Sequence, residues 1–344
     1  MKALRILLVA AMAMMMVSGA FAQELEIGGE AEYSIEFDNT EVGDADAVTN
    51  IALGDGGNVA LTGTVSKELD NGATVSLEGV AILEYDSIGN DGFSLTYANG
   101  PLTVKMLDAD RDGFMSKGLD VYVPQDELYC GELADGRDIS FAYAGDTMKF
   151  VTTLNWNSGT SEYVLIVDDE EITNEVDVNK IGVHPYVEMT AGPATIKALV
   201  EVVNKFPQNT DADGPTVTHF GGGVGVEANL GAIEVGASGG YAVLGGTNYA
   251  GDDVDATNQM SMYAYAKMAV GAGTVGVGGG YDMESIDDVD DDYSGYQVNF
   301  GYEQGDIVVP GLTFKVGAGY AFNESHSKVE TTKTGGSVTL VYGF

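Results

Sequence analysis

Three aspartates at alternate positions form the clearest chemical motif in this chain. Asp108, Asp110 and Asp112 precede Gly113 with the Asp-x-Asp-x-Asp-Gly spacing of calcium-binding loops. Alternate carboxylates can converge on one cation, and glycine permits the sharp turn that such a loop needs. The twelfth position is Leu119, where an EF-hand has a bidentate glutamate, and no flanking helix is readable. The spacing therefore argues against an EF-hand and leaves a looser calcium site in this loop as a hypothesis.

Histidine and cysteine form no catalytic or metal-binding set in the sequence. His184, His219 and His326 lie in different segments without metal-ligand spacing, and Cys130 is the only cysteine. The sequence has no Gly-x-Ser-x-Gly elbow and no phosphate-binding glycine loop before a helix. We therefore expect neither an enzyme nor a required cofactor, and we interpret Cys130 as a small, semi-buried loop residue.

The N-terminal residues have the pattern of a signal peptide. Lys2 and Arg5 precede an apolar run from Ile6 to Val17, and Ala20-Phe21-Ala22 is a small-x-small cleavage site. The apolar run is shorter than the roughly 20 residues that span a bilayer, which disfavours a retained anchor. We expect residues 1–22 to be removed on export, leaving 23–344 as the mature domain.

The net charge of −38 excludes several partners for most of this surface. Nucleic acid and anionic lipid surfaces are unsuitable because like charges repel. Glycine is abundant, with 48 residues, and alternates with valine, tyrosine and phenylalanine. This pattern argues against a disordered chain and suits a curved, closed sheet.

From Leu25 onward, the chain consists of segments in which apolar residues alternate with small or polar ones. These segments must position the side chains of any functional site. Their period of two is that of a β-strand with one apolar face. There are sixteen such segments, an even number that returns both chain ends to the same side of a membrane. We predict strands at 25–37, 57–68, 73–85, 92–98, 101–107, 138–144, 147–156, 181–191, 194–205, 218–230, 232–244, 259–270, 273–283, 294–304, 312–323 and 335–344.

Short and long connections alternate along the chain, which predicts an up-and-down meander with two different ends. The short turns carry the glycine and asparagine that tight hairpins favour. We predict them at 70–72, 99–100, 145–146, 191–193, 230–231, 271–273 and 305–311. The long connections carry most of the aspartates and are predicted at 38–56, 86–91, 108–137, 157–180, 206–217, 245–258, 284–293 and 324–334.

One face of each predicted strand is apolar and the other is small or polar. Tyr296, Val298 and Phe300 alternate with Gln297 and Asn299. A soluble barrel would place its apolar face inside, but sixteen strands enclose a lumen too wide for side chains to fill. The sequence therefore predicts a transmembrane antiparallel up-and-down β-barrel, apolar outside and wet inside.

This architecture resembles the general porins of Gram-negative outer membranes over essentially the whole mature length. The sixteen strands carry the resemblance, together with the longest connection, 108–137, between the fifth and sixth strands and the alternating last strand that ends on Phe344. In that family the corresponding loop folds into the barrel and narrows the pore, and three barrels form a trimer. The resemblance implies an outer-membrane location, lipid and lipopolysaccharide partners, and recognition of Phe344 by the barrel-assembly machinery.

The same resemblance implies a constriction between acids of the long loop and cations of the wall. The acids are Asp108, Asp110, Asp112, Asp120, Asp126, Glu127, Glu132 and Asp135. Strand parity nominates the cations Lys105, Lys149, Lys197, Lys267 and Lys315, with Arg137 at the loop's exit. A transverse field between the two sets would favour small polar solutes over oily ones.

Inward carboxylates outnumber these cations in the predicted register. They are Glu26, Glu30, Glu32, Glu36, Glu78, Glu84, Glu188, Glu201, Glu227, Glu234 and Glu303. Any single one is better interpreted as a solvated lumen residue, but together they predict preference for cations. The acidic run 287–292 is interpreted as a solvated external surface that could bridge lipopolysaccharide phosphates through divalent ions.

We expect a passive diffusion channel for small hydrophilic solutes and ions. One alternative is a substrate-selective channel on the same barrel. Another is a surface anchor or adhesin with no open pore. The fold does not choose among these, because function depends on the constriction and the loops.

Overall fold

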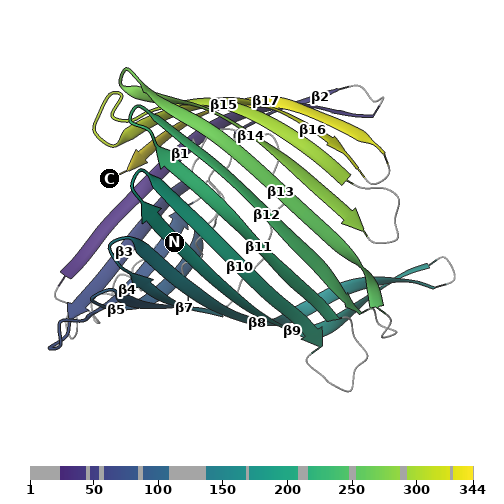
Figure 1. Ribbon diagram of the computed structural model, residues 1–344, viewed down its shortest axis with the longest axis horizontal. Coiled ribbons are helices and arrows are strands. Elements are labelled where there is room, and N and C mark those ends of the chain that lie inside the picture. The colour runs from purple at the N-terminus through teal and green to yellow at the C-terminus, as the bar shows by residue number, and fades with distance from the viewer. Residues whose placement is uncertain are drawn as a thin grey trace.

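The computed structural model describes residues 24–43, 47–53, 58–83, 88–107, 137–167, 170–207, 216–247, 253–286, 293–325 and 328–343. No helix in these ranges has the length and apolarity needed to cross a membrane. The strands, drawn in Figure 1, are β1 (Glu24–Val42), β2 (Val48–Leu53), β3 (Asn58–Glu68), β4 (Thr74–Leu83), β5 (Ile88–Asn99), β6 (Leu102–Leu107), β7 (Arg137–Ala144), β8 (Met148–Val167), β9 (Glu170–Ala191), β10 (Ala194–Pro207), β11 (Thr216–Asn229), β12 (Ile233–Thr247), β13 (Asp253–Val270), β14 (Gly273–Ile286), β15 (Tyr293–Gln304), β16 (Leu312–Glu324) and β17 (Glu330–Gly343).

The strands close into one antiparallel ring. β1 pairs with β17 from Glu30 opposite Gly343 to Val42 opposite Thr331. On its other edge, β1 pairs with β3 through residues 24–32 and with β2 through residues 35–40. β2 and β3 therefore share one place in the ring, and the 17 strands fill sixteen positions of an up-and-down barrel. The predicted all-β barrel is confirmed.

Several predicted long connections are too long, and two of them differ most from the structure. Residues 38–56 contain the end of β1 and the whole of β2. Residues 157–180 belong to a hairpin in which β8 and β9 stay paired as far as Val167 opposite Glu170. A paired backbone satisfies its own hydrogen bonds, so a hairpin can continue after the apolar alternation stops. The sequence pattern marks only the part of each strand that has an apolar face.

The predicted short turns are confirmed where the structure describes them, and they gather at one end of the barrel (Figure 1). Gly100 and Gly192 adopt φ angles of 57° and 62° at two of these turns. Glycine has no Cβ to clash in this left-handed region, so it permits the tight reversal between neighbouring strands.

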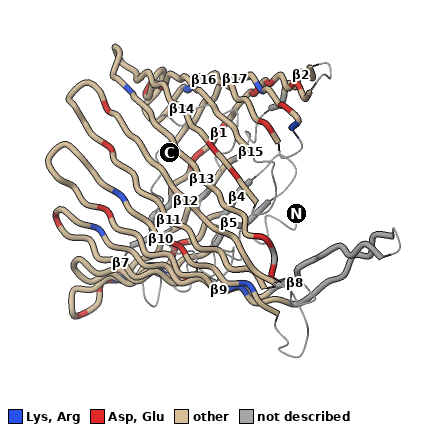
Figure 2. The backbone as a smooth tube through the Cα atoms, turned by 45° about the vertical axis from the view of Figure 1, so that its right-hand side comes forward, with Lys and Arg blue, Asp and Glu red and all other residues tan. Residues whose placement is uncertain are grey.

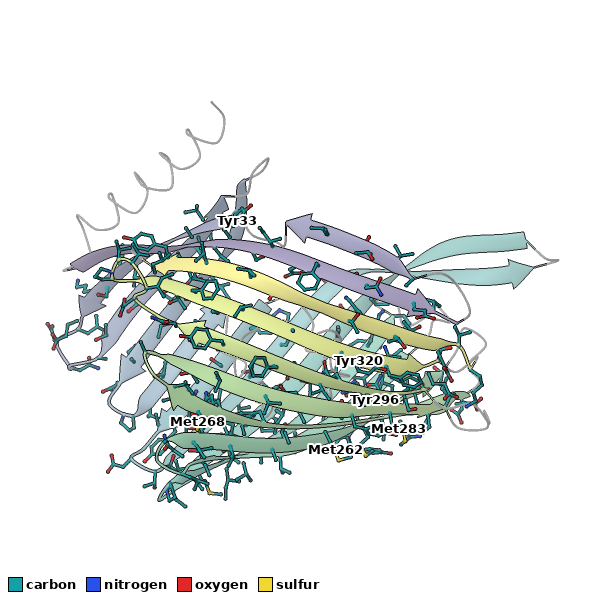
Figure 3. The ribbon with its side chains drawn as sticks, turned by 90° about the horizontal axis from the view of Figure 1, so that it is seen from above. Tyr33, Met262, Met268, Met283, Tyr296 and Tyr320 are labelled. Carbon is teal, nitrogen blue, oxygen red and sulfur yellow. The ribbon has the colours of Figure 1, made fainter. Side chains whose placement is uncertain are left out.

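The two faces of the sheet are reversed relative to a soluble barrel. On β15, Phe300 is 56% exposed, while the neighbouring Gln297 and Asn299 are 1% and 4% exposed. The same separation holds on β17, where Leu340 and Tyr342 are exposed and Thr339 is buried. Figure 3 shows the outer face, with Tyr33, Met262, Met268, Tyr296 and Tyr320 labelled on it.

This reversal confirms the outward register predicted for Tyr296, Val298 and Phe300. The last strand has the same alternation, but Phe344 lies outside the described residues. Exposed apolar side chains surround the ring, and the opposite, lumen face carries polar and charged side chains beside a small buried apolar cluster that includes Val151 and Leu199. Such an arrangement is stable when lipid covers the outside and water fills the inside.

Candidate functional site: the lumen wall

The five lysines nominated from parity all occupy lumen-face register positions. Lys105 stands opposite the buried Ser140, and Lys149 alternates with the buried Val151 and Thr153. Lys197 shares its face of β10 with the buried Leu199 and Glu201. Lys267 and Lys315 stand opposite Glu234 and Glu303.

Glutamates on neighbouring strands accompany these lysines close to the short-turn end. Lys197 Nζ donates to Glu227 Oε1 at 2.7 Å, and Lys267 Nζ lies 2.8 Å from Glu234 Oε1. Glu188 stands opposite Lys149 on one side and opposite Lys197 on the other.

Together these residues form a band that we call the charge belt. Figure 2 shows blue stretches of lysine and red stretches of acid on neighbouring strands. The charge belt consists of Lys149, Glu188, Lys197, Glu227, Glu234, Lys267, Glu303 and Lys315. Its lysines have carboxylate neighbours within the wall itself, so the belt contributes little net charge to the lumen.

The loop acids predicted to oppose the lysines, Asp108 to Asp135, lie outside the described residues, as does the hypothetical calcium motif. The side chain of Arg137 is also outside them. The backbone of Arg137 pairs with Trp156, an exposed residue of the outer face, so its register position is not on the lumen side.

Three lumen lysines near the opposite end were not nominated from the sequence. Lys180 and Lys205 stand directly opposite each other on β9 and β10. Lys333 lies 3.9 Å from Asp38 across the β1–β17 seam. The predicted strand at 181–191 excluded Lys180. Extending the parity of β10 from Lys197 would have placed Lys205 on the lumen face.

β1 carries negative charge on the side of the ring that lies opposite the lysines of β9 and β10. Its lumen face presents Glu30, Glu32, Glu36 and Asp38, of which the three glutamates are exposed. Their register partners on β17 are uncharged, running from Gly343 to Gly335. β10 is eight places from β1 in either direction around the sixteen positions, so these acids face the lysine-bearing strands across the lumen. The side chains of Glu26 and Glu84, also predicted inward, are outside the described set.

Halfway along the barrel, the lumen face of β7 to β15 carries buried polar side chains. Asn155 Nδ2 donates to Asp138 Oδ1, and Glu201 contacts His184. Tyr263 on β13 donates to Asn299 Oδ1 on β15 at 3.1 Å, passing over Gly278 on β14. A Cβ at position 278 would lie 2.0 Å from Tyr263 Oη, so only glycine leaves room for this crossing.

Sequence reasoning named Glu201 but missed the histidine contact, because cross-strand neighbours are set by register and not by sequence spacing. Among the described residues, no group of three or more His, Cys, Asp and Glu side chains is arranged to hold a metal ion. The wall can therefore attract, repel and hydrogen-bond polar solutes, but the described part offers no metal centre.

No protein-family model matches this sequence, and no curated protein matches it. Several solved structures of outer-membrane proteins are similar to it. In-vitro folded OmpT of Vibrio cholerae in its trimer form is 12% identical with a TM-score of 0.62, covering 93% of this chain and 99% of that one.

Two further structures are similar to the same extent. An anion-selective porin from Comamonas acidovorans is 15% identical with a TM-score of 0.61, covering 93% of this chain and 99% of that chain. The outer membrane channel DcaP of Acinetobacter baumannii is 12% identical with a TM-score of 0.63, covering 94% and 98%. At these identities the similarity establishes a porin-like fold.

Proposed function

We propose that this chain is an outer-membrane porin that lets small hydrophilic solutes and ions diffuse passively and prefers cations. The observation that carries the proposal is the reversed sheet: an apolar exterior around a closed ring whose lumen face is polar and charged. Sixteen strand positions enclose more space than wall side chains can fill, as in water-filled porins.

Cation preference rests on the carboxylates that have no lysine opposite them. The charge belt pairs lysine with glutamate, whereas Glu30, Glu32 and Glu36 on β1 face uncharged partners on β17. Exposed negative charge at a pore wall raises the local concentration of cations. The Comamonas porin is anion-selective on a similar fold, so selectivity is expected to depend on wall residues and not on architecture.

Several parts of the proposal come from the resemblance to general porins. We propose that 108–137 narrows the pore, with Asp120, Asp126, Glu127, Glu132 and Asp135 among its acids, and that three copies assemble. The trimer form of OmpT supports the last point by analogy. Export through the signal peptide 1–22 and recognition of Phe344 by the assembly machinery complete this part of the proposal.

Calcium at Asp108, Asp110 and Asp112 remains a proposal of the same kind. Isothermal titration calorimetry should detect binding to the folded barrel that is lost in the Asp110→Asn, Asp112→Asn variant. Identical titrations of the two proteins would remove the site. The channel itself needs no cofactor and no catalytic residue.

Planar-bilayer recording tests the main proposal. The purified protein should give stepwise conductance, and a potassium chloride gradient should give a reversal potential of the sign expected for cations. A reversal potential of anionic sign would contradict the preference. Block by one particular solute would favour a substrate-selective channel, and absence of conductance would favour an anchor or adhesin.

A further inference from the structure

A buried carboxylate lies between two histidines on the lumen face of β9, β10 and β11. Glu201 Oε2 is 2.9 Å from His184 Nδ1, and Glu201 Oε1 is 4.0 Å from His219 Nε2. The three residues are 1%, 2% and 8% exposed respectively. They come from three consecutive strands, so the arrangement exists only when the sheet is paired in this register.

The geometry holds both imidazoles against one carboxylate. Gly221 on β11 stands opposite Glu201, and a Cβ there would lie 3.0 Å from His219 Nε2. The missing side chain therefore leaves room for the His219 ring to lean toward β10. Glu201 Oε2 is within hydrogen-bonding distance of His184, while Glu201 Oε1 accepts no hydrogen bond. A buried carboxylate oxygen without a donor costs free energy, and a positive charge on the facing imidazole, 4.0 Å away, would offset part of that cost.

Other charged and titratable groups share the lumen face of the strands around this cluster. They are Asp138 on β7, Lys149 on β8, Lys180, Tyr186 and Glu188 on β9, Lys197 and Lys205 on β10, Glu227 on β11 and Glu234 on β12. Histidine is the side chain that ordinarily changes charge between pH 5 and 8, and the whole chain has only three histidines. Two of them are in this cluster.

We propose that His184, Glu201 and His219 form a proton-binding site that couples the pH of the lumen to its ion selectivity. With both imidazoles neutral, the cluster carries one negative charge. A proton taken from water by His219 makes its ring an imidazolium whose Nε2 lies 4.0 Å from Glu201 Oε1, within ion-pair distance, and the cluster becomes neutral. A second proton on His184 makes the net charge positive. Acidification thus reduces the negative charge of the lumen wall, and cation preference falls.

This inference rests on the proposed channel function, so one test uses the channel and another does not. In planar bilayers, the cation-over-anion permeability ratio of the unchanged protein should fall by about twofold or more from pH 8 to pH 6. The variant His184→Gln, His219→Gln should lose this pH dependence. Glu227→Gln is the matched control: it should lower the ratio at both pH values but keep the change between them.

His326→Gln controls for the remaining histidine and should behave like the unchanged protein. Persistence of the pH dependence in the double histidine variant, or its loss in His326→Gln, would overturn the proposal.

The second test follows the imidazole resonances of the detergent-folded barrel by NMR. Both imidazole signals, those of His184 and His219, should change between pH 8 and pH 6, and the change should differ in Glu201→Gln, which removes the carboxylate that both rings face. If neither signal changes between pH 8 and pH 6, or if the change is the same in Glu201→Gln, the proton site is overturned. This readout needs no open pore, so absence of conductance would count against the channel function while NMR still decides the site.

Discussion

The lumen faces of β1 and β10 lie opposite each other and treat their carboxylates differently. On β1, Glu30, Glu32 and Glu36 are exposed and have uncharged partners on β17. On β10, Glu201 is 1% exposed and held by a histidine, and Lys197 has Glu188 and Glu227 as neighbours. The comparison teaches that a count of inward acids is not a measure of lumen charge. Acids without nearby cations act on solutes at every pH, whereas the effect of a held acid on solutes depends on the charge of its neighbours.

The largest effect is expected from neutralising the acids of β1. The variant Glu30→Gln, Glu32→Gln, Glu36→Gln should lower the cation-over-anion permeability ratio by about fivefold, because three exposed charges leave the lumen together. Reversal potentials in a salt gradient measure this.

The matched control removes the same charge from residues outside the lumen register, with Glu41→Gln, Glu324→Gln and Glu330→Gln. This variant should keep the ratio near that of the unchanged protein. Equal losses in the two triple variants would mean that total charge, and not lumen position, sets selectivity.

A second prediction compares stability. Glu201→Ala should lower the free energy of unfolding by about 1–3 kcal/mol, because the buried His184 Nδ1 loses its partner. Glu36→Ala, at an exposed position, should change it by less than about 0.5 kcal/mol. Guanidinium unfolding of the detergent-folded barrel, followed by tryptophan fluorescence, measures both. Similar costs for the two substitutions would contradict the distinction between held and exposed carboxylates.

The charge belt gives a smaller effect of opposite sign. Lys197→Met with Lys267→Met leaves Glu227 and Glu234 without their lysines, so the permeability ratio should rise by about twofold. Each partly exposed pair contributes only about 0–1 kcal/mol, so the unfolding midpoint should barely move. Lys67→Met is the control, because Lys67 stands opposite Val75 in the outward register of β3 and β4. If the permeability ratio changed by the same factor in Lys67→Met, the charge belt would not explain the effect.

Salt gives the smallest and most general test. Raising ionic strength from 0.1 to 1 M shortens the Debye length from about 10 to about 3 Å, so the exposed acids of β1 should lose much of their reach. The permeability ratio of the unchanged protein should fall toward one. The β1 triple variant should show a weaker dependence on salt. Equal salt dependence in the two proteins would mean that residues other than the β1 acids determine the selectivity.

The sequence predicted the ring and its two faces because alternation is a local signal that lipid and water enforce residue by residue. It therefore placed Lys267 and Lys315 on the correct face. It failed where pairing alone decides, as in β2 and the far part of the β8–β9 hairpin. It also could not bring His184, Glu201 and His219 together. Their contact depends on the register of three strands, and no spacing along the chain encodes that register.

β1 holds a special place in the folding of this barrel. It pairs with β17 through residues 30–42, and it also joins both pieces of the interrupted second position, β2 and β3. The contact between β1 and β17 spans nearly the whole described chain, and contacts of high sequence separation form slowly because a long loop must first close. The strand with the exposed acids is thus also the strand that completes the ring. In a chain that stalls before closure, the strands that carry the charge belt would already be paired with one another. The separation of charge across the lumen would not yet exist, because β1 would not yet be fixed opposite β10.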